Sequence, residues 1–343
     1  MAQRQRENFY RQSILTVHHS RKALVSLINL HLSHKQVSFE DFLNHNQHKI
    51  YHFYKESQKC CQCKNQPVGK KLLLQFQLED LFEIHGRKRA GHLSTSTHEF
   101  CCSKAKSGIK TDSLSATLAR FLLFNFCVDV FWYSCLALAN LKFDDFIDKN
   151  KHTLFHKLAN NITCCQCQQD SVISEKPNPL FQFPCPQGSV ISEKPNLLFQ
   201  FQWNILFTFN PDVTCSGIQG QQYCICKQQA VKGIEQTVRQ DKTLERTIFE
   251  CACPIWKGVE KIVVLRNATY DYSKHGEIPD SRYISMKEEL HKIVADIAIV
   301  TKGESHVIQQ LHYLQQRPFD ESKYIKYKTI LMNESIKTED TKM

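Results

Sequence analysis

The sequence predicts a mostly α-helical protein, in which two helical Cys/His repeats with long loops precede a C-terminal helical module. Three observations predict this class: a gapless internal repeat, apolar residues spaced three and four positions apart, and cysteines gathered between the helical segments. The chain has 343 residues, 42% of them hydrophobic, which is enough for the cores of two or three domains.

The internal repeat is clearest between Phe39–Cys63 (FEDFLNHNQHKIYHFYKESQKCCQC) and Phe143–Cys167 (FDDFIDKNKHTLFHKLANNITCCQC), 104 positions later. His48 and His52 match His152 and His156 in the same register as the CCQC motif. Within the first copy, Phe39, Phe42 and Leu43 begin a series at helical spacing, and Ser38 is the expected N-cap. We therefore expect each copy to be a helix that leads into a cysteine-bearing loop.

The similarity continues downstream. Gln75–Phe82 (QFQLEDLF) matches Gln200–Phe207 (QFQWNILF), and we align Phe100–Cys102 with Tyr223–Cys226. The second copy is longer because SVISEKPN occurs twice, 18 positions apart. A duplicated, proline-containing stretch is typical of an exposed loop that tolerates insertion.

These matches predict four parts of the chain. Repeat one spans 10–112, and repeat two spans 113–242, with the duplicated loop at 171–201. A helical module spans 243–333 and a disordered tail 334–343. In the module we expect two helices after a first one whose apolar face is formed by Met286, Leu290, Ile293, Val294 and Ile297.

The N-terminus carries charge where a secretory signal would be apolar, so we expect a cytoplasmic protein with reduced thiols. Phe121–Ala139 has almost the length and composition of a membrane span. The corresponding segments Val17–Lys35 and Thr247–Leu265 contain several charges, which favours a buried core helix and no membrane contact. The net charge of +10 permits contact with nucleic acid, but no long basic run is present.

The cysteines predict structural zinc. Cys60-x-x-Cys63 and Cys164-x-x-Cys167 have the spacing of two thiolates on one tetrahedral ion. We expect the other two ligands to be Cys101 and Cys102 in the first repeat, and Cys224 and Cys226 in the second. The alternative is a set of buried, reduced thiols that pack as small hydrophobic side chains.

Histidines form a second repeated pattern. His48 and His52 lie four positions apart, as do His152 and His156, so each pair shares one helical face. That arrangement suits a metal ion or paired proton-transfer groups. It equally suits two imidazoles bonded to neighbouring backbone groups.

The apolar helix VEKIVVLRN, ending at Arg266 and Asn267 and followed by Tyr272 and His275, resembles a HEPN (higher eukaryotes and prokaryotes nucleotide-binding) domain. The most similar form is that of DAZ-interacting zinc-finger-like proteins and their lineage-expanded invertebrate relatives with CCQC repeats. The resemblance implies a homodimer through the module. It also implies either a metal-independent endoribonuclease, with the arginine on the phosphate and a histidine transferring protons, or an inactive module that binds RNA or protein.

The chain departs from the HEPN pattern at the histidine. Tyr272 stands within the window where the family has histidine, and His275 follows later. A phenol with a pKa of about 10 is a poor base near neutrality. We therefore expect no catalysis and a HEPN-like module that binds RNA or protein, as in an innate-defence family. The alternatives are a HEPN-type endoribonuclease and a zinc-stabilised structural scaffold.

Overall fold

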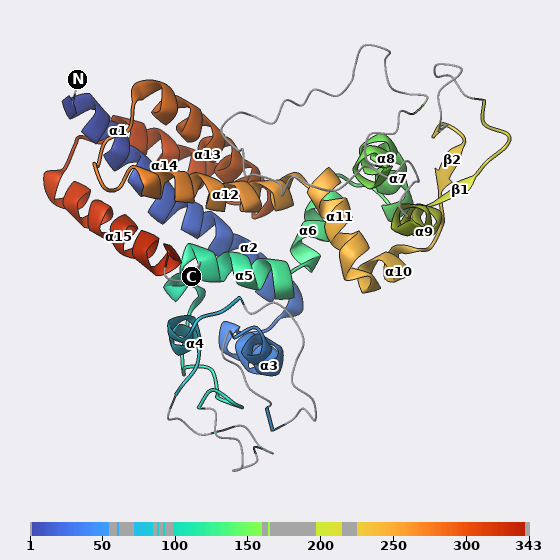
Figure 1. The fold of residues 1–343 in the computed structure, drawn as a ribbon, viewed down its shortest axis with the longest axis horizontal. Coiled ribbons are helices and arrows are strands. Elements are labelled where there is room, and N and C mark those ends of the chain that lie inside the picture. The colour runs from blue at the N-terminus through green and yellow to red at the C-terminus, as the bar shows by residue number, and fades with distance from the viewer. Residues whose placement is uncertain are drawn as a thin grey trace. The chain divides into compact units, whose positions relative to one another are not determined.

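The computed structural model describes residues 2–54, 60–61, 72–84, 88, 92, 99–159, 164, 197–214 and 225–339. These residues are mostly helical, as the sequence predicts (Figure 1). The chain forms two compact units. Unit 1 contains Met1–Val130 and Gly258–Met343, and unit 2 contains Phe131–Lys257. The boundaries between the units fall inside helix α6 (Asp129–Cys135) and helix α12 (Pro254–Asp271).

Unit 1 is built from helices. They are α1 (Ala2–Ile14), η1 (Leu15–His19), α2 (Ser20–Lys35), α3 (Phe39–His52), α4 (Gln75–Leu81), η2 (Thr111–Ser113), α5 (Ala116–Phe126), α13 (Asp280–Val300), α14 (Glu304–Gln316) and α15 (Glu321–Glu339). The three helices predicted near the C-terminus are confirmed, and the five residues of the predicted apolar face of α13 are all buried.

The first three elements of unit 1 form one continuous helix with a single wider turn. Residues Ile14 and Ser20, which flank the π-helical turn η1, keep right-handed helical backbone angles. The Ser20 hydroxyl donates to the carbonyl oxygen of Leu15 at 3.0 Å, which fits the five-residue step of a π turn. The helix ends where Gln36 adopts a left-handed conformation (φ 54°).

This long helix is the centre of unit 1. Its α2 segment packs against α5 and α13, and its α1 segment packs against α13 and α15 (Figure 1). The fully enclosed apolar side chains at these contacts include Leu24, Leu27 and Ile28 of α2, Leu118 and Leu122 of α5, and Leu290 and Ile297 of α13. The C-terminal helices therefore share a core with the N-terminal ones, a grouping that differs from the sequential order of the predicted domains.

Unit 2 has helices and one small sheet. Its elements are α7 (Phe143–Lys149), α8 (Lys151–Ala159), α9 (Leu197–Leu206), β1 (Phe207–Phe209), β2 (Gln228–Ala230), α10 (Glu235–Gln240) and α11 (Lys242–Ala252). Strands β1 and β2 are antiparallel, and Phe207 pairs with Ala230. The core is aromatic: Trp132 lies 4.6 Å from Phe249 between ring centroids, and its indole N–H donates to Glu245 at 2.8 Å.

The apolar stretch Phe121–Ala139 is divided between α5 and α6, with Cys127 at the end of α5. Among the described residues, no single helix has the length and apolar composition needed to cross a membrane. Helices α5 and α6 meet that measure only as a pair, and the pair is bent by 79°.

The predicted repeat is visible in the bonds of both copies. Helix α3 corresponds to α7 and α8, which are separated by a break at Asn150. Asn46 donates its side-chain N–H to the carbonyl oxygen of Phe42 at 2.9 Å, and Asn150 donates to that of Phe146 at 2.8 Å. The same side-chain bond is thus formed 104 positions apart in the two units.

A second set of bonds connects each of these helical segments to a later part of its own unit. The Asn44 side-chain oxygen accepts from the backbone N–H of Ala105 at 3.0 Å, and Asp148 accepts from that of Ala230 at 2.9 Å. The residue corresponding to Ala105 is therefore Ala230, 125 positions later. This offset fixes the register of the downstream half of the repeat.

Three other backbone contacts recur with the same offset of 125 positions. The bridge between Phe82 and Ala105 in unit 1 corresponds to the pairing of Phe207 with Ala230 in unit 2. The hydrogen bond from Lys106 N to Leu81 O corresponds to that from Val231 N to Leu206 O. The hydrogen bond from Ser103 N to Phe100 O corresponds to that from Gln228 N to Ile225 O. In the structure Phe100 thus corresponds to Ile225, two residues away from the Tyr223 of the sequence alignment. Cys101 corresponds to Cys226, and the position of Cys102 holds Lys227.

Candidate metal centres

The first Cys/His cluster lies at the end of α3. Ser38 begins this helix as predicted, since its hydroxyl accepts the backbone N–H of Asp41 at 3.0 Å. Four helical positions bring the rings of His48 and His52 to 4.5 Å between centroids. The Sγ of Cys60, a buried residue, lies 3.6 Å from His48 Nδ1 and 3.5 Å from His52 Nε2. We call His48, His52 and Cys60 the first triad.

Unit 2 contains the same arrangement. The rings of His152 and His156 on α8 are also 4.5 Å apart between centroids. The Sγ of Cys164 lies 3.5 Å from His156 Nε2. His152, His156 and Cys164 are the second triad, and the three potential ligand atoms lie within 4.8 Å of one another. Both triads have three residues between the histidines and seven between the second histidine and the cysteine.

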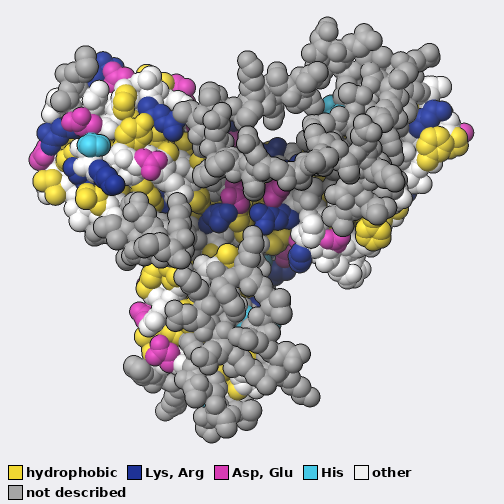
Figure 2. Space-filling model, in the orientation of Figure 1, with side chains coloured by type: hydrophobic (Ala, Val, Ile, Leu, Met, Phe, Trp, Pro, Cys, Tyr) yellow, Lys and Arg dark blue, Asp and Glu magenta, His cyan; other side chains and the backbone are white. Residues whose placement is uncertain are grey.

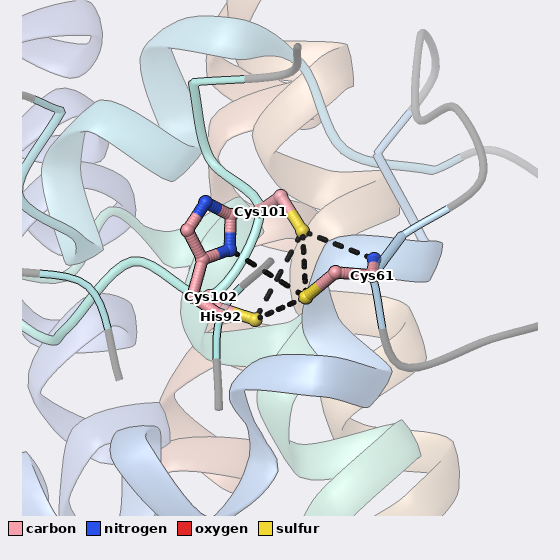
Figure 3. A group of neighbouring side chains, drawn as sticks. All are labelled: Cys61, His92, Cys101 and Cys102. Carbon is pink, nitrogen blue, oxygen red and sulfur yellow. Dashed lines mark hydrogen bonds between the residues drawn. The ribbon is translucent and has the colours of Figure 1, made fainter. Parts of the chain in front are cut away.

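A third cluster, with four possible ligands, lies in unit 1. It contains Cys61, His92, Cys101 and Cys102, whose side chains converge in Figure 3. Cys61 Sγ lies 3.1 Å from Cys102 Sγ, 3.6 Å from Cys101 Sγ and 3.5 Å from His92 Nδ1. We call it the tetrad. Its four ligands come from positions up to 41 residues apart.

The separations within the clusters are close to those of a metal centre. Tetrahedral zinc binds sulfur at about 2.3 Å and nitrogen at about 2.0–2.1 Å, so ligand atoms lie about 3.5 Å apart for S and N, and about 3.8 Å apart for two S. The S-to-N separations of 3.5–3.6 Å match this in all three clusters. Two of the sulfur pairs in the tetrad, at 3.6 and 3.9 Å, also match. Each cluster could therefore hold a metal ion such as zinc.

Protonation of the ligands competes with metal binding in these clusters. Burial raises the pKa of the Cys102 thiol, and its bond to Cys61 acts in the same direction. A metal ion would displace that proton, because the thiolate is the ligand. Burial lowers the pKa of His156, and the neighbouring His152 lowers it further, which keeps its nitrogen free of a second proton near neutrality.

A lysine lies beside the tetrad. Lys88 Nζ donates to Ser103 Oγ at 3.0 Å and also to the carbonyl oxygen of Glu99. Burial lowers the pKa of Lys88, while Cys101 and Cys102 act in the opposite direction. The Lys88 side chain thus lies beside a ligand set that would carry three thiolates when metallated.

The structure groups the predicted ligands differently from the sequence interpretation. Cys60 joins His48 and His52, while Cys101 and Cys102 join Cys61. The predicted set had placed Cys60 with Cys101 and Cys102, and had treated the histidine pairs as separate sites. Cys226 is described and half-buried. Cys63, Cys167 and Cys224 lie outside the described residues.

Two tetrad residues were absent from the predicted ligands. Cys61 is the middle cysteine of CCQC, and the sequence interpretation passed over it because only Cys60 and Cys63 have the C-x-x-C spacing. His92 stands in no periodic or repeated pattern, so no sequence signal points to it.

The structure buries Arg266 of the predicted HEPN-like segment in unit 1. This residue lies within α12 and is only 5% exposed, and its guanidinium donates to Thr117 Oγ1 at 2.8 Å. It also lies 5.3 Å from the ring centroid of Tyr270. Asn267 faces outward, whereas Tyr272 and the exposed His275 follow the end of the helix. This position leaves little of the guanidinium exposed to contact a phosphate.

The charged surface gives no separate indication of a nucleic-acid site on the face seen in Figure 2. There, the described Lys and Arg side chains are interspersed with Asp and Glu. Among its described residues, unit 1 contains ion pairs such as Arg120–Glu260 at 2.8 Å and Lys261–Glu289 at 2.8 Å.

Comparison of the chain with protein-family models, curated proteins and solved structures finds no match.

Proposed function

We propose that this protein is a zinc-stabilised helical scaffold without a catalytic role. One observation carries the proposal: the same His–His–Cys triad is formed in two units, with identical sequence spacing and the same 3.5 Å separation between the cysteine sulfur and the second histidine. The triad is thus a property of the repeat and not of one unit alone.

The ligand chemistry favours zinc. Thiolate and imidazole together are the ligands of structural zinc, and harder ions such as Mg²⁺ and Ca²⁺ prefer oxygen. The tetrad provides four protein ligands, which leaves no open position for a substrate or an activated water. This arrangement supports a structural role for the ion.

The positions of the ligands explain what the metal would stabilise. Cys61 and Cys101 are separated by 40 positions, so one ion in the tetrad would close a long segment of chain. Cross-linking distant positions stabilises a fold chiefly by restricting the unfolded chain. Within each triad, the ion would fasten a cysteine to the last turns of the preceding helix.

Hydrogen exchange of the full chain before and after zinc removal tests this function. With zinc removed by a chelator under reducing conditions, we expect faster exchange at the end of α3, at 99–106 and in α8. Helix α13, which packs on α1 and α2 and carries none of these ligands, should keep its protection. Unchanged exchange throughout would show that no metal stabilises these segments.

A matched pair of variants separates ligand loss from core damage. Cys60 and Cys127 are both buried in unit 1, but only Cys60 belongs to a cluster. We expect Cys60→Ser to reproduce the exchange increase at the end of α3 and Cys127→Ser to retain the zinc content of the unaltered chain. Equal zinc content in the two variants would count against the first triad.

A further inference from the structure

Two consecutive cysteines of unit 1 belong to different clusters. Cys60 directs its sulfur to His48 and His52, and Cys61 directs its sulfur to the tetrad. The Cα atoms of consecutive residues are about 3.8 Å apart. One peptide unit therefore joins the first triad to the tetrad.

We infer that the first triad and the tetrad bind two ions as a coupled pair, with the Cys60–Cys61 peptide as the connection between them. An ion in the tetrad would raise the affinity of the triad for its own ion. The inference rests on the proposed metal binding and adds a property that separate structural sites would not have.

The contacts around Cys61 explain how coupling arises. Its side chain is a ligand of the tetrad, and its backbone N–H also donates to the sulfur of Cys101 at 3.5 Å. Amide bonds to ligand sulfurs orient the ligands of a metal centre. A metallated tetrad would thus hold both the side chain and the backbone of Cys61, and with them the position of the residue before it.

In the first triad, only the cysteine would be positioned by the metallated tetrad. His48 and His52 are already held four positions apart on α3, whereas Cys60 has to be brought to them. Fixing the backbone of a residue carries an entropic cost that loading of the tetrad would already have met. Metal-site coupling of roughly tenfold in affinity is within the usual range for linked sites.

Unit 2 offers an internal comparison. Its triad has the same ligands and spacing, but the position that corresponds to Cys102 is Lys227, which cannot serve as the same ligand. Among the described residues of unit 2, the second triad is the only such cluster. The coupling should therefore be a property of unit 1.

Titration of the full chain with Co²⁺ tests the inference, because thiolate-to-cobalt absorption grows with the number of thiolates and so distinguishes the tetrad from the triads. A background His156→Ala removes the second triad. In this background we expect Cys102→Ser, which leaves Cys60 and Cys61 intact, to weaken Co²⁺ binding at the first triad roughly tenfold. Cys127→Ser is the control and should leave both affinities unchanged.

Loss of the helical circular dichroism signal would reveal that Cys102→Ser fails to fold. In that case a second variant tests the same coupling from the side of the triad. Coupling is reciprocal, so His52→Ala should lower the affinity of the tetrad by the same factor. Unaltered affinity of the remaining centre in a folded variant would overturn the coupling and leave the proposed scaffold standing. Absence of Co²⁺ binding by the background chain would instead reject the metal-binding proposal itself.

Discussion

Arg266 is the best example of a residue whose surroundings decide its role. It lies on a helix beside the exposed Asn267, yet its guanidinium is enclosed and bonded to Thr117. Replacing this buried side chain by alanine would remove the bond to Thr117 and leave a space among the buried residues around it. The structure assigns Arg266 to the packing of α12 on α5.

We therefore expect Arg266→Ala to lower the free energy of unfolding by about 1–3 kcal/mol. Asn267→Ala, one position along the same helix, should change it by less than about 0.5 kcal/mol. Urea unfolding followed by circular dichroism measures both values. Equal and small effects would indicate that Arg266 is not packed as described.

His19 contributes to the pH dependence of the free energy of unfolding. Burial lowers its pKa from 6.5 to about 4, and nearby positive groups lower it further; these are His18, Lys22, His291 and Arg317. Between these two pH values the unfolded chain binds a proton that folded His19 does not. The free energy of unfolding must therefore fall as the pH falls through this window.

The loss attributable to His19 is at most about 3 kcal/mol, since one pKa unit corresponds to about 1.4 kcal/mol. Urea unfolding at pH 7, 5.5 and 4 checks the prediction. His19→Gln should show a shallower decline than the unaltered chain. The same slope in both chains would mean that other groups account for the acid response.

At the scale of single elements, the two copies of the repeat differ at the start of one helix. The Ser38 hydroxyl caps α3, whereas Lys142, 104 positions later, forms no side-chain cap at the start of α7. We expect Ser38→Ala to destabilise unit 1 by about 1 kcal/mol. Lys142→Ala is the matched control and should have almost no effect; a cost as large as that of Ser38→Ala would contradict the difference in capping.

Local patterns in the sequence predicted the helices well, because the start and the apolar face of a helix depend on residues close together in the sequence. The Ser38 cap and the apolar face of α13 follow from spacings within one helix. The downstream register followed only in part. The match of Gln75–Phe82 with Gln200–Phe207 has the offset of 125 positions that the structure shows, whereas the alignment of Phe100 with Tyr223 does not. The structure pairs Phe100 with Ile225, because backbone bonds to the preceding strand-like segments set the register.

At the scale of the whole molecule, contacts between distant residues were the least predictable part. The sequence gives no local sign that α13 packs on α1 and α2, since each helix shows only its own apolar face. The same holds for His92, which reaches the tetrad from a position without periodicity. Cys60 belongs to the first triad and Cys61 to the tetrad. This assignment depends on where the segment with Cys101 and Cys102 packs, which neighbouring residues in the sequence do not reveal.

Each of the two units contains a candidate metal centre. Each unit has its own core and its own triad, and both triads lie where a helix ends and a cysteine-bearing segment follows. A protein of this kind should lose order in both units when its ions are removed, because the ligands must be deprotonated and held together for binding.

The most direct measurement is native mass spectrometry of the full chain purified with zinc under reducing conditions. The three clusters among the described residues predict at least three zinc ions per chain. They also predict one ion fewer after His52→Ala and one fewer after His156→Ala, and no loss after Cys127→Ser. A fully reduced, folded chain that carries no zinc, or variants whose zinc content does not change, would contradict the metal-stabilised scaffold.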